Sequence, residues 1–361
     1  MAGRAHDAGM VQFARDHTAY SSRPVGARPL DVHPLDRHPL DPRPLDPRTL
    51  LSRSPANPIL RARDLPYPVN SVFNPGAARV GDDTVLLARA ERFTGQSHLV
   101  VARSADGVSG WQFDLEHDLQ PDPERHPEDR WGIEDPRIVF SPELERHLVT
   151  FTSYSGDGPV VSLATTADFH SFDRLGVICP PDDKDAAILP RRFGGDWLLI
   201  HRPVREPGVP ANLCVSRSRD LRNWRAPEIL LPAREGGWWD ARKIGMGPPP
   251  METDEGWLLL YHGVRTTGSG CLYRSGLALL DLEDPTRVIA RGDDFIFGPE
   301  TLYERTGDVP NVVFPEGWVL ADDGRSLNIY YGAADSSVGL ATAKLDDLLD
   351  YVRRFPVGGL D

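Results

Sequence analysis

The residues with the clearest capacity for chemistry stand in the segment Trp131-Gly-Ile-Glu-Asp-Pro-Arg137. Two carboxylates and a guanidinium lie there between apolar residues, where an apparent strand over 138–140 begins. A carboxylic acid in such surroundings can be tuned as a general acid, and Asp135 is the candidate. The alternative is that Asp135 only caps a turn before Pro136. No second acid of equal prominence stands nearby, so a base that works with Asp135 has to be of another kind.

Basic residues stand beside several apolar runs. Arg89, Arg202 and His262 each follow such a run, and Lys184 precedes Ala187-Ile-Leu189. For each residue alone, an ordinary turn or surface position is the alternative. If they converge from different strands, they form an anion pocket, in which Arg suits bidentate phosphate contacts and Lys acts as a point charge.

Composition and missing motifs exclude several classes. The net charge of −13, with scattered Arg residues, argues against general binding to nucleic acids. No apolar run is long enough to span a membrane, no signal-peptide pattern opens the chain, and the three cysteines form no zinc or disulfide pattern. Neither a phosphate-binding G-x-x-x-x-G-K-[ST] loop nor an H-E-x-x-H motif occurs. We therefore expect a cytoplasmic protein with no metal and no cofactor.

The elements that must position these residues are mostly strands. Turn segments such as Gly156-Asp-Gly158 separate short runs rich in Val, Ile, Leu and aromatic residues. The runs are 84–88, 98–103, 148–153, 159–164, 196–201, 257–262, 274–280 and 327–331. Helical periodicity is scarce, and the one candidate is a short C-terminal helix over 344–353.

A repeat also runs through the chain. Val101-Ala-Arg-Ser-Ala-Asp106, Leu163-Ala-Thr-Thr-Ala-Asp168 and Val215-Ser-Arg-Ser-Arg-Asp220 are alike, and looser copies begin at Leu277 and Leu340. A spacing of roughly 50–65 residues suits four-stranded blades around an axis. Five copies predict an all-β fold, a five-bladed β-propeller. A two-sheet sandwich is the alternative, but it does not explain the repeat.

The N-terminal segment differs from the rest. A Pro-Leu-Asp unit recurs every four or five residues over 28–46, and this density of proline disfavours both helix and sheet. We expect residues 1–55 to form an extended or disordered arm and residues 56–361 to form the propeller domain. The alternative is that the arm reaches a neighbouring subunit of a homo-oligomer.

At this level of detail the chain resembles glycoside hydrolase family 130, the inverting β-mannoside phosphorylases with a five-bladed propeller. The resemblance covers about residues 55–350. It is carried by motifs in a fixed order: Asn57-Pro-Ile-Leu60, Val72-Phe-Asn-Pro-Gly-Ala77, Gly132-Ile-Glu-Asp-Pro-Arg137, Lys184-Asp185, His201-Arg-Pro203, Gly245-Met-Gly-Pro-Pro-Pro250, Tyr261-His-Gly263, Tyr273-Arg-Ser-Gly276, Asn311-Val-Val-Phe-Pro315 and Tyr330-Tyr-Gly-Ala-Ala-Asp335. Ala90-Glu-Arg-Phe93 departs from the Glu-Asp-Arg usual beside Arg89, which affects contacts with the sugar and not the reaction.

The resemblance implies a role for each matched residue. Asp135 corresponds to the single general acid. The positions that bind inorganic phosphate correspond to Lys184, Arg202, His262 and Tyr273. Those that hold the mannosyl unit correspond to Asn74, Arg89 and Asp335.

The expected activity is inverting phosphorolysis of a β-mannoside, giving α-mannose 1-phosphate. The expected partners are inorganic phosphate as co-substrate and a β-1,4-mannooligosaccharide or mannosyl-glucose, although the sequence leaves the β-1,2 linkage open. Two alternatives remain: a β-mannoside hydrolase of the same family, and a catalytically silent sugar-binding propeller. Hydrolases would lack the basic residues, and a silent protein has no need of Asp135.

Overall fold

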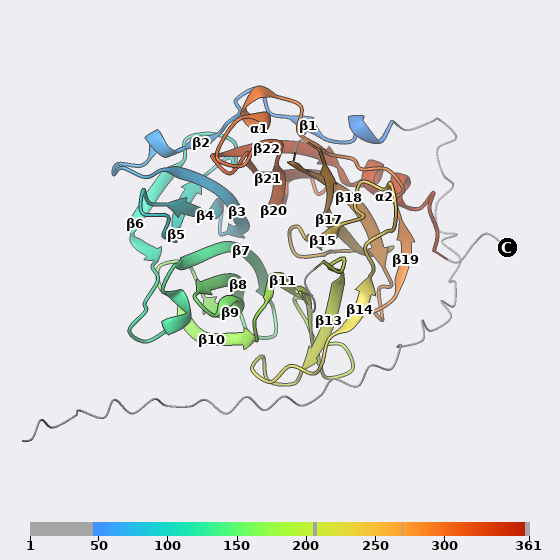
Figure 1. The fold of residues 1–361 in the computed structure, drawn as a ribbon, viewed down its shortest axis with the longest axis horizontal. Coiled ribbons are helices and arrows are strands. Elements are labelled where there is room, and N and C mark those ends of the chain that lie inside the picture. The colour runs from blue at the N-terminus through green and yellow to red at the C-terminus, as the bar shows by residue number, and fades with distance from the viewer. Residues whose placement is uncertain (1–45, 205–207, 269, 358–361) are drawn as a thin grey trace, which may run out of the picture. The chain divides into compact units, whose positions relative to one another are not determined.

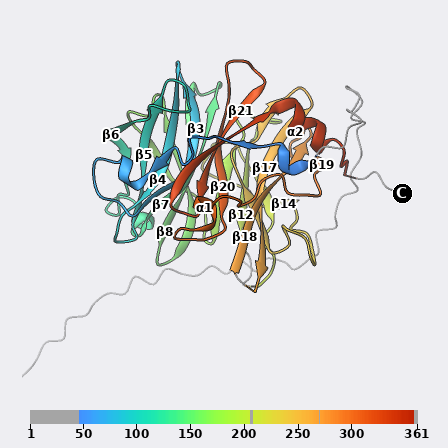
Figure 2. The same cartoon turned by 90° about the horizontal axis from the view of Figure 1, so that it is seen from above.

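The computed structural model describes residues 46–204, 208–268 and 270–357, which all lie in one unit, Val32–Asp361. Antiparallel sheets dominate these ranges and helices are few (Figures 1 and 2), so the predicted all-β class is confirmed. None of the helices in these ranges is long and apolar enough to cross a membrane. Residues 1–45 of the predicted Pro-Leu-Asp arm lie outside the described residues.

The strands follow one another in groups that each form an antiparallel meander. The first group holds β3 (Ser71–Val80), β4 (Asp83–Glu91), β5 (Ser97–Ser104) and β6 (Gln112–Leu119). The second holds β7 (Gly132–Ser141), β8 (Arg146–Ser155), β9 (Gly158–Thr166) and β10 (Asp173–Cys179). The third holds β11 (Asp183–Ile188), β12 (Trp197–Pro203), β13 (Leu213–Ser218) and β14 (Glu228–Leu231). A single parallel pair, Ser97 with Gly132, joins the first two groups into one sheet.

The fourth group holds β15 (Lys243–Met246), β16 (Met251–Thr253), β17 (Gly256–Thr267), β18 (Gly270–Leu280) and β19 (Val288–Arg291). The last holds β20 (Val313–Leu320), β21 (Ser326–Ala333) and β22 (Ser337–Lys344). Helix α1 (Leu302–Arg305) precedes the last group and α2 (Leu345–Val352) follows it, which confirms the C-terminal helix. Short 3-10 turns occur at Pro47–Thr49, Ala62–Asp64 and Pro127–Asp129.

The N-terminal part of the described chain completes the last sheet. Strands β1 (Ser52–Arg53) and β2 (Leu60–Arg61) both pair with β22. Between them, the Asn57 side chain donates to the carbonyl of Leu340 (2.8 Å) and accepts from its N–H (2.8 Å), as a strand residue would. The predicted boundary at residue 55 therefore lies inside a segment that is paired into the domain.

The core consists of apolar clusters that each lie between two consecutive groups of strands. Successive side chains of a strand point to opposite faces. Leu86 and Val100 accordingly pack with residues of the last sheet, such as Leu340, whereas Leu87 and Val101 pack with the second group. The remaining clusters join the second group to the third, the third to the fourth and the fourth to the last. Because the first group also packs on the last, the contacts form a closed cycle.

The first strand of each group lies innermost. Figure 1 shows β3, β7, β11, β15 and β20 around a common centre, with the later strands of each group farther out. The middle strands are buried on both faces, which explains why they are continuous apolar runs in the sequence. All eight predicted strand runs lie, to within one residue, in the second or third strand of a group, where the fourth group is taken in its sheet order β15-β17-β18-β19.

Candidate active site

The innermost strands share an irregularity that points polar side chains toward the centre. The pairing register breaks between Phe73 and Pro75, between Glu134 and Arg137, and between Lys184 and Ala187. At these breaks Asn74, Asp135 and Asp185 have φ values of 47°, 53° and 53°. Asn and Asp are among the few non-glycine residues that adopt this left-handed conformation readily. A bulge of this kind redirects a side chain, and here it does so at the same position of three strands.

Asp135 is buried and accepts two hydrogen bonds from side chains of the first group. Its Oδ1 is 2.9 Å from Nδ2 of Asn74 and 3.2 Å from Nη1 of Arg89. Burial alone would raise the pKa of Asp135, but the positive charges of Arg89, Lys184 and Arg137 outweigh it and lower that pKa below the ordinary value. In the ligand-free protein, Asp135 is therefore a carboxylate.

Arg89 lies at the centre of an acidic group of side chains. Its guanidinium contacts Glu134 at 3.0 Å, Glu91 at 3.2 Å and the Ser97 hydroxyl at 2.9 Å, in addition to Asp135. These partners fix the orientation of the guanidinium, which lies 4.6 Å from the centre of the Phe73 ring.

Asp335 faces the same group from the turn between β21 and β22, where its φ is 50°. Burial raises its pKa to about 7, and the negative charge of Asp135 adds to the effect while Arg89 opposes it. Near neutral pH, Asp335 is thus partly protonated beside a charged Asp135.

A second cluster, which we call the cationic cluster, comprises Lys184, Arg202, Lys243, His262 and Tyr273. Arg202 donates to Oδ2 of Asp185 through Nε at 2.7 Å and lies 2.6 Å from it through Nη2. The same oxygen is 3.4 Å from Nε2 of His262. Burial would raise the pKa of Asp185, but Arg202 and His262 hold it well below the ordinary value. One carboxylate therefore anchors the cluster.

The two lysines of the cationic cluster, Lys184 and Lys243, carry charge that Asp185 does not balance. Lys184 pairs with Arg202 in the β11–β12 register. The Lys243 ammonium lies 5.3 Å from the centre of the Tyr273 ring. Burial and the positive charges of Arg202 and Lys184 together lower the pKa of Lys243 to about 8, while Asp185 opposes them. Such mutual repulsion shows that the cations are close and favours an anionic ligand among them.

His262 is deeply buried, and burial lowers its pKa to about 4, so its imidazole is neutral at neutral pH. Its Nδ1 and the Oδ1 of Asn74 are buried atoms with no hydrogen-bond partner among the described residues. Buried polar atoms normally have partners. The group around Asp135 and the cationic cluster thus each hold a polar atom that could form a hydrogen bond with a ligand.

Two glycines allow the clusters to pack. A Cβ at Gly245 would lie 2.3 Å from Oδ2 of Asp185 and 2.4 Å from Cε1 of His262. A Cβ at Gly332 would lie 1.8 Å from Oδ1 of Asn74. Neither position has room for any other residue.

Arg137 connects the innermost strands. It is almost fully buried and donates to the carbonyls of Asp135 (2.8 Å) and Met246 (3.0 Å). Its Nη2 also lies 3.0 Å from Oε1 of Glu316 on β20 and 3.7 Å from Oδ1 of Asp185. Arg137 therefore stands between the two clusters and fixes the position of both.

The structure brings the predicted site residues into these two clusters. Asn74, Arg89 and Asp135 are in direct contact, Asp335 interacts with them through its charge, and the four predicted phosphate-binding residues all belong to the cationic cluster. Their catalytic and binding roles stay predictions.

Sequence reasoning assigned no role to Arg137, Asp185 and Lys243, although the first two lie within motifs that were recognised. A signal was present for Asp185. Asp185 in Lys184-Asp-Ala186 stands near the start of its group of strands, as Asp135 does in Glu134-Asp-Pro136, although only the Asp is common to the two segments. Lys243 stands in Lys243-Ile-Gly-Met246, which is too short to reveal a strand.

Comparison with known proteins agrees with this geometry. The family model of Glyco_hydro_130, described as β-1,4-mannooligosaccharide phosphorylase, matches residues 54–354. A β-1,4-mannooligosaccharide phosphorylase of Ruminococcus albus is 31% identical over an alignment of 309 residues, which covers 83% of this chain and 90% of that protein.

Solved structures also relate the chain to mannoside phosphorylases. The β-1,2-mannobiose phosphorylase of Listeria innocua, in complex with β-1,2-mannobiose, superimposes with a TM-score of 0.76 at 28% identity and covers 84% of this chain and 99% of that chain. A further solved structure is described with the finding that the GH130 family of mannoside phosphorylases contains glycoside hydrolases that target β-1,2 mannosidic linkages in Candida mannan. Its TM-score is 0.71 at 25% identity, and it covers 88% of this chain and 97% of that chain.

Proposed function

The chain belongs to glycoside hydrolase family 130 and is an enzyme, and we propose that it cleaves β-mannosides by inverting phosphorolysis to give α-mannose 1-phosphate. The observation that carries the proposal is the pairing of one buried acid, Asp135, with a separate cationic cluster. Lys184, Arg202 and Lys243 together carry more positive charge than Asp185 neutralises, so the cluster suits a dianion.

We also propose that the fold is a five-bladed propeller, with one blade for each group of strands. The closed cycle of apolar clusters and the innermost position of the first strands support this assignment. In such a fold, the inner strands of all blades reach the same central site. The pairing of β1 and β2 with β22 would then close the ring by joining both ends of the domain in one blade.

Phosphate takes the part that a second carboxylate plays in inverting hydrolases. Those enzymes use one acid to protonate the leaving oxygen and one base to activate water. Phosphate is already a nucleophile and needs only to be held on the opposite face of the sugar. One of its oxygens forms the new bond to the anomeric carbon while the bond to the leaving oxygen breaks. The leaving oxygen receives the proton of Asp135, by the family resemblance through the mannose 3-hydroxyl.

Asp135 must gain a proton before it can act, because in the ligand-free protein it is a carboxylate. A dianion bound near Lys184 offsets one of the charges that lower its pKa. A sugar bound over Asn74 and Arg89 removes water, which disfavours the charged form further. Both ligands therefore raise the pKa of Asp135 toward a value suited to a general acid.

The test is turnover of β-1,4-mannobiose with and without inorganic phosphate, followed by ³¹P and ¹H NMR. We expect α-mannose 1-phosphate and mannose in equal amounts, and no product without phosphate. β-1,4-Mannobiose is the first choice because the family description and the R. albus relative name this linkage. Parallel reactions with mannosyl-glucose and β-1,2-mannobiose determine the acceptor and the linkage.

The second candidate is hydrolysis of a β-mannoside, which the structure related to β-1,2-mannoside hydrolases favours. Release of free mannose at the same rate with and without phosphate would establish it and refute phosphorolysis. The cationic cluster argues for phosphorolysis, because water as nucleophile has no use for this charge. None of the three cysteines, Cys179, Cys214 and Cys271, forms a disulfide bond, which fits the proposed cytoplasmic location.

A further inference from the structure

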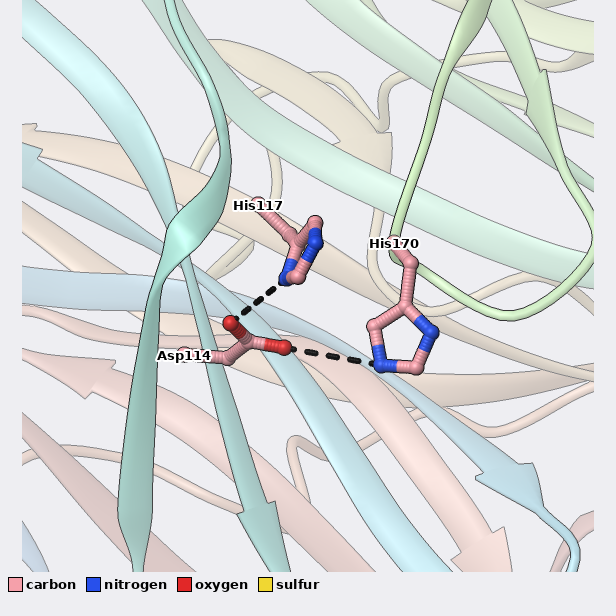
Figure 3. A group of neighbouring side chains, drawn as sticks. All are labelled: Asp114, His117 and His170. Atoms are coloured by element: carbon pink, nitrogen blue, oxygen red, sulfur yellow. Dashed lines mark hydrogen bonds and ion pairs between the residues drawn. The ribbon is translucent and has the colours of Figure 1, made fainter.

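Asp114, His117 and His170 lie together (Figure 3), with one potential ligand atom from each within 4.8 Å of the other two. Asp114 and His117 stand on β6, and His170 stands in the loop between β9 and β10. Oδ1 of Asp114 is 2.7 Å from Nδ1 of His117, and its Oδ2 is 3.6 Å from Nε2 of His170. The cluster therefore joins two groups of strands.

An irregularity in β6 makes this arrangement possible. Residues three apart in a regular strand point to opposite faces. Here Asp114 pairs with Val101 and Leu119 pairs with Leu99, so β6 has extra residues relative to β5. A bulge of this kind turns a side chain toward the opposite face. It places Asp114 and His117 on one side, facing the loop that carries His170.

The surroundings of His170 leave one ring nitrogen facing Asp114. Its Nδ1 is 3.4 Å from Oδ2 of Asp168, and its backbone N–H donates to Oδ1 of the same residue (2.9 Å). A carboxylate on one ring nitrogen fixes the tautomer in which the other carries a lone pair, as is common for metal-binding histidines. The lone pairs of His170 and Asp114 then face each other at a distance too long for a hydrogen bond.

We propose that Asp114, His117 and His170 bind a divalent transition-metal cation. Two imidazoles and one carboxylate suit Zn²⁺, Co²⁺ or Ni²⁺, whereas Mg²⁺ and Ca²⁺ prefer oxygen ligands alone. Binding would replace the contact between Asp114 and His117. Arg103 limits the affinity, because its Nε lies 3.8 Å from Oδ2 of Asp114 while its Nη2 is held by the carbonyl of Asp168 (2.7 Å).

The role of the metal is to join the first two groups of strands, not to catalyse. In the register of β7, β8 and β9, Glu134 pairs with Thr152, whereas the loop with His170 follows Thr166, which pairs with His147. Asp135 and His170 therefore lie toward opposite ends of the same sheet. No sequence motif marks this site, because Asp114 and His170 are far apart in the sequence.

The experiment uses the full chain without an affinity tag, treated with EDTA and desalted into a phosphate-free buffer so that zinc phosphate does not precipitate. Competition with a chromophoric chelator measures Zn²⁺ binding, and calorimetry measures Tm with Zn²⁺ or Mg²⁺. We expect about one tightly bound Zn²⁺ per chain, and a rise in Tm of about 2 °C or more at about 100 µM Zn²⁺ but not with Mg²⁺.

The variants are His117→Gln and His170→Gln, with His126→Gln as matched control because His126 also faces a carboxylate, Oε1 of Glu128 at 3.3 Å. Each of the first two should weaken Zn²⁺ binding about 10-fold or more and abolish the rise in Tm, and the control should do neither. Anomalous diffraction at the zinc edge should place the ion between the three side chains.

Equal Zn²⁺ binding by all variants, or no binding at about 100 µM, would overturn the proposal and leave a cluster of ion pairs. Circular dichroism of the metal-free variants shows whether each is folded. A variant that is unfolded is replaced by Asp114→Asn, for which the same loss of binding is expected. Activity is not a readout, so failure of this proposal and failure of the proposed function are independent.

Discussion

In four of the five groups the first and second strands pair irregularly, whereas the second and third strands pair regularly. The exception is β15, which pairs with β17 without a register break. The register breaks between β3 and β4, β7 and β8, β11 and β12, and β20 and β21. It runs unbroken between β4 and β5, β8 and β9, β12 and β13, β17 and β18, and β21 and β22. The second and third strands consist largely of buried apolar residues, and the irregular inner strands carry Asn74, Asp135 and Asp185. Arg89, Arg202 and His262 also belong to the candidate site, and they lie at or near the ends of the second strands β4 and β12 and within β17.

The difference separates stability from chemistry within one sheet. The regular pairs bury apolar side chains on both faces and supply most of the burial that favours folding. The left-handed residues and buried charges of the inner strands reduce stability, but they hold the polar groups in a fixed arrangement. Changes to the polar residues of the site should therefore alter activity with little effect on folding, and changes to the buried apolar residues of the middle strands should do the reverse.

The largest expected effect is that of Asp135→Asn, which keeps the shape of the side chain and its tolerance of positive φ. Turnover of the natural substrate should fall about 10³-fold or more, because the leaving oxygen receives no proton. Phosphate affinity, measured by calorimetry, should stay the same or increase, because a negative charge has been removed. The control is Asp173→Asn on the outermost strand β10, which should leave turnover unchanged. Substantial turnover by Asp135→Asn would show that another group is the acid.

The next effect is that of Lys243→Gln in the cationic cluster. Loss of one charged contact should raise KM for phosphate about 10- to 100-fold, with a smaller change in kcat. Because the pKa of Lys243 is lowered to about 8, the wild-type protein should lose phosphate affinity as the pH rises from 7 to 9. Lys243→Gln should lack this part of the pH dependence. The exposed Lys344 supplies the matched control, Lys344→Gln, and an equal rise in KM there would refute a specific role for Lys243.

The same comparison explains what the sequence could reveal of the fold. Runs such as 98–103 and 257–262 were recognised as strands because residues buried on both faces form continuous apolar segments. The inner strands β3, β11, β15 and β20 were not recognised. Pro75 and Pro315 interrupt two of them and normally argue against a strand, although a bulge tolerates proline.

The candidate site was recovered through motifs rather than through geometry. Asp135 and Lys184 lie in segments that resemble the family, but no local pattern shows that they meet. Lys243 was missed because its importance comes only from neighbours on other strands. The site is made by contacts between distant segments, and a sequence without its fold does not contain those distances.

The matching prediction for the regularly paired strands concerns Leu163→Ala in β9. Leu163 is fully buried between the second and third groups, so its truncation should lower the free energy of unfolding by about 2–5 kcal/mol. Below the unfolding transition, kcat and KM should change less than about 2-fold, because the inner strands keep their positions. Denaturant titration and steady-state kinetics measure the two quantities. A fall in kcat without a loss of stability would mean that the two parts of the sheet are not separate.

The smallest expected effect concerns Asp335, whose folded-state pKa is raised from 3.8 to about 7 by burial and by the negative charge of Asp135. Between these pH values, the folded protein holds one more proton than the unfolded chain, so its stability decreases as the pH rises through this window. Asp335→Asn removes this loss and should be more stable than the wild-type protein at pH 8, with the advantage shrinking toward pH 4.

Asp323→Asn, in the turn between β20 and β21, gives the opposite sign. Hydrogen bonds from the Ser326 hydroxyl and from the N–H groups of Arg325 and Ser326 lower the pKa of Asp323. The stability that these bonds provide is present above the unfolded-state pKa and is lost as the pH falls through the folded-state pKa. Asp323→Asn should therefore be less stable than the wild-type protein at pH 8. If both variants changed Tm in the same direction at pH 8, burial of the Asp335 carboxylate would not destabilise the folded protein relative to the exposed turn at Asp323. Asp335 would then be charged in the folded protein at little cost in stability.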